Sequence, residues 1–196
     1  MAYAYLIGDI YLAIIWLILY LKNKNLKKEM LFGSILYPSI IFPLGLITMF
    51  LSFIFPKITW RYIPDYFNPD TLFNLSRITK FGAIEDILFM FFAGGIIAII
   101  YEIILKKNVI KVNKRHHILS IVGFFTSYLI IAFIFTFNPI YNLIISSFIG
   151  FIIVVLQRRD LIKHSLYGAV IFTTFFFISI IIFNIIFPDA INTFWT

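Results

Sequence analysis

The chain has 196 residues, of which 62% are hydrophobic and 13% charged, and its formal net charge is +7. This apolar share exceeds the roughly one half that is typical of soluble domains, so the composition predicts a polytopic membrane protein. The sequence contains no cysteine, which excludes disulfides and thiolate metal sites, and its basic residues lie in short loops between apolar runs, which indicates membrane topology and no nucleic-acid partner.

Six apolar runs are long enough to cross, or nearly cross, a bilayer core that takes about 20 helical residues. All six are predicted as helices, because helices satisfy their own backbone hydrogen bonds in lipid and the runs lack the period-two alternation of a membrane barrel. The predicted fold is therefore an all-α, polytopic membrane bundle of about six transmembrane helices. The predicted spans are 4–21, 31–55, 82–105, 118–137, 141–156 and 166–187.

Three groups of basic residues follow the first, third and fifth spans, and these three loops therefore lie on the same side of the membrane. The tendency of basic loops to stay in the cytoplasm predicts that residues 22–30, 106–117 and 157–164 are cytoplasmic and that the N-terminus is outside. The first basic residue is Lys22, so the start lacks the charged region of a signal peptide. We expect the first run to remain as a span of the plasma membrane.

An internal repeat relates the first two spans to the last two. Residues 21–33 and 156–168 share two leucines and a glycine at a constant offset of 135, and Trp60 has a counterpart in Trp195. The alternative is a chance similarity between two hydrophobic hairpins. If the repeat is real, a second acidic helix would follow Trp195, so either the sequence is truncated, or that helix was lost or is supplied by a partner. The interpretation is one integral membrane domain over 1–196, with a first repeat at 1–105, a linking span at 118–137 and an incomplete second repeat at 141–196.

Two adjacent carboxyl groups stand at the head of the third span. On a helix Glu85 and Asp86 point about 100° apart, so only one of them faces the centre of the bundle squarely. Because a charge facing hydrocarbon is costly, an acid inside a membrane span indicates a functional site. Alternatively, the two acids cap the helix and pair with Arg77 or Lys80 at the membrane interface.

Further polar and small residues occur within the spans. Asp9 lies early in the first span, either as a second polar group of the same cavity or as a shallow interfacial residue. Glu102 is expected to pair with Lys106 at i+4. The small residues 93–95 are expected to let another helix approach closely. The sequence has no metal-ligand spacing, dinucleotide turn, phosphate loop or Asp-rich diphosphate motif, so we expect chemistry that uses a hydrophobic substrate and a proton but no cofactor or metal.

The sequence Ile-Glu-Asp-Ile-Leu-Phe at 84–89 resembles the small membrane-embedded lycopene cyclases of archaea and actinobacteria. That family carries Pro-[Leu/Ile]-Glu-[Glu/Asp], followed by Phe, at the start of a membrane helix, and Ala83 stands where the family usually has proline. The region 60–89, the glycine pair at 94–95 and the Tyr-Glu pair at 101–102 are also similar, so the resemblance covers most of the chain. The family's second carboxylate motif is absent from this sequence.

What the resemblance implies is acid-catalysed cyclisation of the end group of a linear carotenoid or isoprenoid polyene, which is an isomerisation without redox change. By transfer of the motif, Glu85 would be the leading acid/base and Asp86 its catalytic partner. Aromatic ring faces would stabilise the carbocation by about 1–2 kcal/mol each where water is excluded. The residues expected to bind the substrate are Phe89, Phe91, Phe92, Trp60 and Asp9.

The implied partners are the polyene substrate, membrane lipid and another subunit, in a homo- or heterodimer, that supplies a second acidic helix. The alternative function is a non-enzymatic multispan membrane protein, such as a small transporter or a lipid-binding partner. In that protein Glu85 and Asp86 would bind an ion or relay protons. An isoprenoid enzyme of different chemistry is a third hypothesis, which the missing diphosphate motif disfavours.

Overall fold

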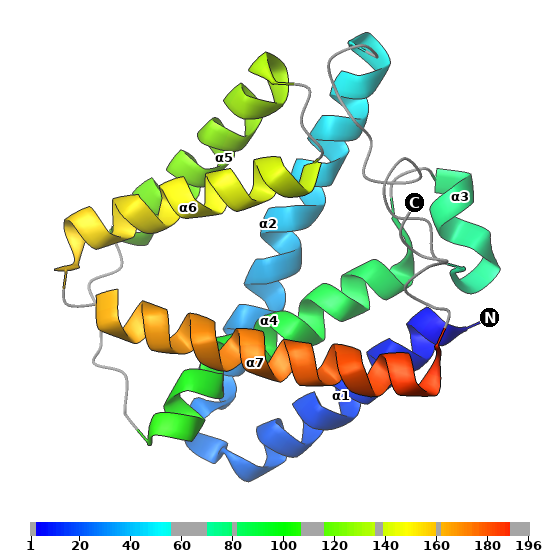
Figure 1. The fold of residues 1–196 in the computed structure, drawn as a ribbon, viewed down its shortest axis with the longest axis vertical. Coiled ribbons are helices and arrows are strands. Elements are labelled where there is room, and N and C mark those ends of the chain that lie inside the picture. The colour runs from blue at the N-terminus through cyan, green and yellow to red at the C-terminus, as the bar shows by residue number, and fades with distance from the viewer. Residues whose placement is uncertain are drawn as a thin grey trace.

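The computed structural model describes residues 3–55, 70–79, 82–106, 116–135, 139–159 and 162–188. Within these ranges all regular structure is helical, which confirms the all-α prediction. The long helices are α1 (Ala4–Lys22), α2 (Lys27–Ile54), α4 (Ile84–Leu105), α5 (His116–Ile134), α6 (Pro139–Gln157) and α7 (Ile162–Ile186), and the short ones are η1 (Lys24–Leu26), η2 (Leu72–Asn74) and α3 (Leu75–Thr79) (Figure 1).

The long helices coincide with the predicted spans, and no boundary differs by more than the four residues that separate Lys27, the start of α2, from the predicted start at 31. In the described part of the chain, five helices are long and apolar enough to cross a membrane: α1, α2 together with η1, α4, α6 and α7. The apolar stretch of α5, Ile118–Ile134, is shorter. Many large apolar side chains on these helices are exposed, as lipid-facing side chains are. Together these features indicate a membrane protein.

Glycines let α2 and α4 cross at close range. A Cβ atom on Gly33 would lie 2.6 Å from the carbonyl oxygen of Gly94, and a Cβ on Gly94 would lie 2.6 Å from the carbonyl oxygen of Gly33. A Cβ on Gly95 would collide with Ser34 Oγ and Trp16 Nε1. Real Cβ atoms essentially never come within 3.0 Å of such neighbours, so the crossing requires glycine. The close approach predicted for residues 93–95 is therefore confirmed, and α2 is the helix that makes it.

The buried apolar residues form two clusters. In the first, Leu12 of α1 packs with Ile96 and Ile100 of α4, and α7 adds partly buried side chains. In the second, Leu44 of α2 packs with Tyr128 of α5, and α6 adds a partly buried leucine. Figure 1 shows α5 and α6 as a hairpin set apart from α1, α4 and α7. Among the described residues, α2 contacts both regions, because Leu44 lies in the second cluster and Gly33 crosses α4.

Contacts at one end of the bundle join the flanks of the predicted basic loops. The hydroxyl of Tyr101, near the end of α4, shares a hydrogen bond with Nδ1 of His164 at the start of α7. Glu102 is buried, and the nearby charge that acts on it belongs to Glu29 in the first turn of α2. The expected ion pair between Glu102 and Lys106 is absent from the described residues. Lys106 has left the helical path, with φ of 51°, and so no longer stacks one turn above Glu102.

Candidate functional site

Asp86 holds the start of α4 in place. Ala83 is the N-cap residue, and its N–H donates a hydrogen bond to Asp86 Oδ2 at 2.7 Å. The hydroxyl of Tyr5, on α1, donates to Asp86 Oδ1 at 2.6 Å. Both carboxyl oxygens of Asp86 are therefore engaged, one as a helix cap and one as a tie between α1 and α4. The capping hypothesis drawn from the sequence holds for this residue.

Glu85 is buried and only half engaged. Its side chain is 1% exposed, and its Oε1 accepts a hydrogen bond from the backbone N–H of Leu72 in η2. Its Oε2 has no hydrogen-bond partner in the part of the chain that the structure describes. The expected interfacial partner Arg77 is instead bound to Asp70 at 3.0 Å, and Lys80 lies outside the described residues. Glu85 therefore presents one unengaged carboxyl oxygen inside the protein.

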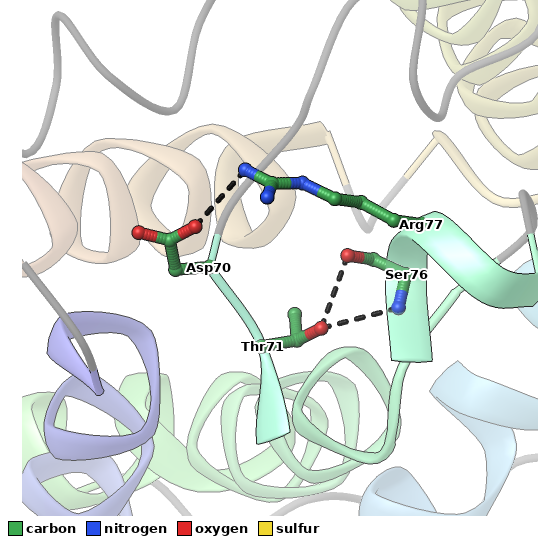
Figure 2. Close-up of polar contacts among 4 residues, drawn as sticks. All are labelled: Asp70, Thr71, Ser76 and Arg77. Atoms are coloured by element: carbon green, nitrogen blue, oxygen red, sulfur yellow. Dashed lines mark hydrogen bonds and ion pairs between the residues drawn. The ribbon is translucent and has the colours of Figure 1, made fainter. Parts of the chain in front are cut away.

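The segment 70–79 holds in place the backbone N–H of Leu72, from which Glu85 accepts a hydrogen bond. Figure 2 shows Thr71 Oγ1 accepting the N–H of Ser76 at 3.1 Å, with the two hydroxyls 3.0 Å apart. The exposed ion pair between Asp70 and Arg77 closes the same turn (Figure 2). Leu72 directly follows Thr71, so this braced turn holds its N–H toward Glu85. The segment thus covers the start of α4 and positions one of the two acids.

Asp9 brings a third carboxyl group to the start of α4. Its side chain is 2% exposed, and neither of its oxygens has a hydrogen-bond partner among the described residues. Asp9 is one helical turn after Tyr5, so the two share a face of α1, and Tyr5 fixes that face against Asp86. Asp9 also lies within electrostatic range of both Asp86 and Glu85. Of the two alternatives for Asp9, its burial favours a polar group in the same interior site.

Phe89 connects the carboxyl cluster to α7. It follows Glu85 by one turn of α4 and packs against the first buried cluster. Its ring lies edge-on to Phe176 of α7, with centroids 6.1 Å apart. About two turns further along α7, the ring of Phe183 faces α1, because a Cβ atom on Gly8 would lie 3.3 Å from it. The helix turns that carry Asp9 and Glu85 are therefore also in contact with aromatic rings of α7.

Phe91 and Phe92 surround Trp16, one of the residues that sequence reasoning missed. The ring centroids of Phe91 and Phe92 lie 5.6 and 6.1 Å from that of Trp16. The indole N–H of Trp16 donates to Ser34 Oγ at 2.9 Å, which fixes the ring between α1 and α2. The sequence signal for Trp16 was its place two turns after Asp9, on the same face of α1. The predicted substrate residue Trp60 lies outside the described residues.

The chemistry available to this cluster is proton transfer. Within the described ranges, none of the three carboxyl groups forms an ion pair, and no three His, Asp or Glu side chains are grouped to hold a metal ion. Asp9 and Glu85 are both buried, and each has at least one carboxyl oxygen without a hydrogen-bond partner in the described residues. Such groups can give up and accept protons without a metal.

The fold and the site define a helical membrane protein with an interior carboxyl cluster. No protein-family model, no curated protein and no solved structure matches this chain. The function is therefore inferred from the chemistry of the carboxyl groups, the rings beside them and the lipid around them.

The substitution Ala83→Pro is expected to destabilise the start of α4. Proline has no N–H to donate to Asp86, and its ring holds φ near −65°, whereas Ala83 has φ of −121°. Loss of this hydrogen bond alone should lower the free energy of unfolding by about 1–3 kcal/mol. Thermal unfolding of the purified protein in detergent measures the effect.

Ala83→Ser is the matched control. Serine keeps the backbone N–H and adds a hydroxyl that can cap the helix, so the stability should stay equal or rise. Equal stability of the proline and serine variants would contradict the capping role of Asp86.

Proposed function

We propose that this chain is a multi-pass membrane isomerase of the lycopene-cyclase type, which cyclises the end group of a linear carotenoid or related isoprenoid polyene by acid catalysis. The observation that carries the proposal is the pair of buried carboxyl groups, Glu85 and Asp9, each with at least one oxygen that has no hydrogen-bond partner in the described residues. A hydrocarbon polyene has no polar group for such a site to bind. Proton transfer to a double bond is therefore the reaction that these carboxyl groups can carry out on it.

The reaction conserves every atom of the substrate. A carboxylic acid transfers its proton to the terminal carbon–carbon double bond, which leaves a tertiary carbocation. The neighbouring double bond attacks this cation and closes the ring, and a carboxylate then removes one proton to form the ring double bond. Glu85 is the leading acid/base in this scheme, and Asp86 positions it by fixing the start of α4. In this scheme the rings of Phe89 and Phe92 would stabilise the cation.

We place the carboxyl cluster toward the outer side of the plasma membrane. The flanks of the predicted cytoplasmic loops meet at the opposite end of α4, where Tyr101 binds His164. The N-terminus would then be outside, and the polyene would enter from the lipid. A second subunit, in a homo- or heterodimer, would contribute a further acidic helix for the other end of the substrate.

Pigment chromatography of a lycopene-accumulating bacterial host tests this function. Expression of the chain should convert linear pigment to a cyclic isomer of the same mass, whereas a host with the empty vector should keep linear pigment. Unchanged pigment, with the protein present in the membrane fraction, would contradict the proposal.

A second candidate function is proton or ion binding in a small transporter. The observation that favours it is Asp9, a buried carboxyl group with no partner for either oxygen in the described residues. Such a protein reconstituted in vesicles would show uptake that depends on an ion gradient and is lost in Asp9→Asn. The same protein would leave the host's pigment linear.

A further inference from the structure

The three carboxyl groups of the cluster differ in how many hydrogen bonds they receive. Asp86 receives two, from Tyr5 and Ala83, and Glu85 receives one, from the N–H of Leu72. Asp9 receives none within the described residues. A carboxylate in an apolar interior depends on such donors, because each one replaces part of the lost hydration. The three acids therefore differ in how well they can carry a negative charge: Asp86 can do so best, Glu85 less well and Asp9 least.

The helix ends add to this grading. Glu85 and Asp86 stand in the first turn of α4, where free N–H groups and the helix dipole stabilise a negative charge. Asp9 is the sixth residue of α1, beyond the first turn, so it gains little from that helix end. In the part of the chain that the structure describes, neither hydrogen bonds nor a helix terminus support a negative charge on Asp9.

We propose that Asp9 is the proton donor of the cyclisation and that Glu85 is the proton acceptor, an inference that rests on the proposed function. Asp9 gives its proton to the terminal double bond and becomes a carboxylate, the ring closes, and Glu85 takes one proton from the ring and becomes a neutral acid. Glu85 then releases its proton to solvent and Asp9 takes one from solvent, which restores the starting state. One proton enters the polyene and one leaves, so the product is an isomer of the substrate.

The rings around the cluster fit this assignment. Phe183 of α7 packs on α1 at Gly8, next to Asp9, and Phe89 follows Glu85 by one turn on α4. The helix turn of the donor is therefore in contact with an aromatic ring, and the turn after the acceptor carries one. Electron-rich ring faces stabilise the cation while it exists between the two proton transfers.

Solvent deuterium separates the two roles. The full chain, reconstituted in lipid discs in D₂O with a linear polyene, should place one deuterium in each ring that it forms. Asp9→Asn should abolish deuterium entry into both the product and the recovered polyene. Glu85→Gln should abolish ring product while the recovered polyene still gains deuterium, because Asp9 can protonate the double bond and take a proton back. Deuterium entry that survives Asp9→Asn and disappears in Glu85→Gln would overturn the assignment.

Infrared spectroscopy of the resting protein tests the proton on Asp9 without any turnover. A neutral carboxyl group absorbs at a higher frequency than a carboxylate, and a ¹³C-aspartate label shifts only the aspartate bands. We expect a neutral carboxyl band that moves with the aspartate label, disappears in Asp9→Asn and persists in Asp86→Asn. A spectrum in which the aspartate label moves no neutral band would overturn the role of Asp9.

The two measurements also separate this inference from the function on which it rests. If the parent protein forms no ring in the reconstituted system, the proposed function fails, whatever the infrared spectrum shows. If the parent forms rings and Asp9→Asn forms them equally fast, the function stands and the donor role of Asp9 is refuted. Asp9→Glu retains a carboxyl group and should keep part of the parent's activity. That result would show that the loss of activity in Asp9→Asn is not a folding defect.

Discussion

Glu85→Gln is expected to reduce the formation of cyclic pigment by at least about a hundredfold, the usual scale of a lost general acid or base. Glutamine preserves the size of the side chain and can still accept the N–H of Leu72, but it cannot exchange a proton at neutral pH. The rate of ring formation in the reconstituted protein measures the effect, and membrane extraction followed by thermal unfolding confirms that the variant is folded.

Glu102→Gln is the matched control for this experiment. Glu102 is a buried glutamate on the same helix, with a side chain that is 7% exposed, but it lies about 25 Å from Glu85 along α4. Its replacement should leave the rate of ring formation close to that of the parent. Equal losses in the two variants would mean that burial of any acid on α4, and no particular chemistry at Glu85, supports the activity.

Gly94→Ala is expected to lower the free energy of unfolding by about 1–3 kcal/mol, the usual cost of overpacking. The new methyl group would lie 2.6 Å from the carbonyl oxygen of Gly33 and 2.7 Å from Cβ of Tyr37, so α2 must move away from α4. Both obstructing atoms belong to the backbone or sit directly on it, and neither can rotate aside. Unfolding of the purified protein by heat or denaturant measures the change.

Gly168→Ala provides a control of the opposite sign. On α7 the nearest atom to a Cβ at this position is Cδ2 of Tyr101, at the ordinary contact distance of 3.9 Å. Alanine has a higher helix propensity than glycine by about 1 kcal/mol, so this variant should be as stable as the parent or more stable. If both alanine variants are equally stable, α2 and α4 do not cross at Gly94.

The sequence predicted the helices well because each membrane span must be apolar along its whole length. The runs at 4–21 and 82–105 became α1 and α4 with shifts of at most two residues. The acidic pair could also be found, because Glu85 and Asp86 interrupt an otherwise apolar stretch. The helix positions and the acidic pair both depend on local composition, which can be read from one sequence without knowing how the chain folds.

The contacts between helices could not be predicted in the same way. Asp9 and Glu85 are far apart in the sequence, and the packing of α1 on α4 brings their carboxyl groups within electrostatic range of each other. The sequence placed Arg77 near the acidic pair, but the turn at 70–79 gives it a closer partner in Asp70. The difference between a satisfied Asp86 and a half-engaged Glu85 likewise depends on which donors the fold brings to each oxygen.

The proposed duplication of the first two spans in the last two remains a prediction, as does the role of Trp60, which lies outside the described residues. In the structure α6 packs against its neighbour α5, while α1 packs against α4. These contacts join different pairs of spans and do not test whether the two halves share an ancestor.

The two prolines inside α2 divide that helix between the two packing regions of the molecule. Gly33 docks on α4, Leu44 packs with the α5–α6 hairpin, and Pro38 lies between them. Pro38 has no backbone N–H, so it cannot donate a hydrogen bond to the carbonyl of the residue four before it. Pro43, five residues later, lacks the same hydrogen bond. A helix bends at least cost where such bonds are missing. The middle of α2 is therefore the part of this helix that bends at least cost, and it lies between the segment that docks on α4 and the segment that packs with the hairpin.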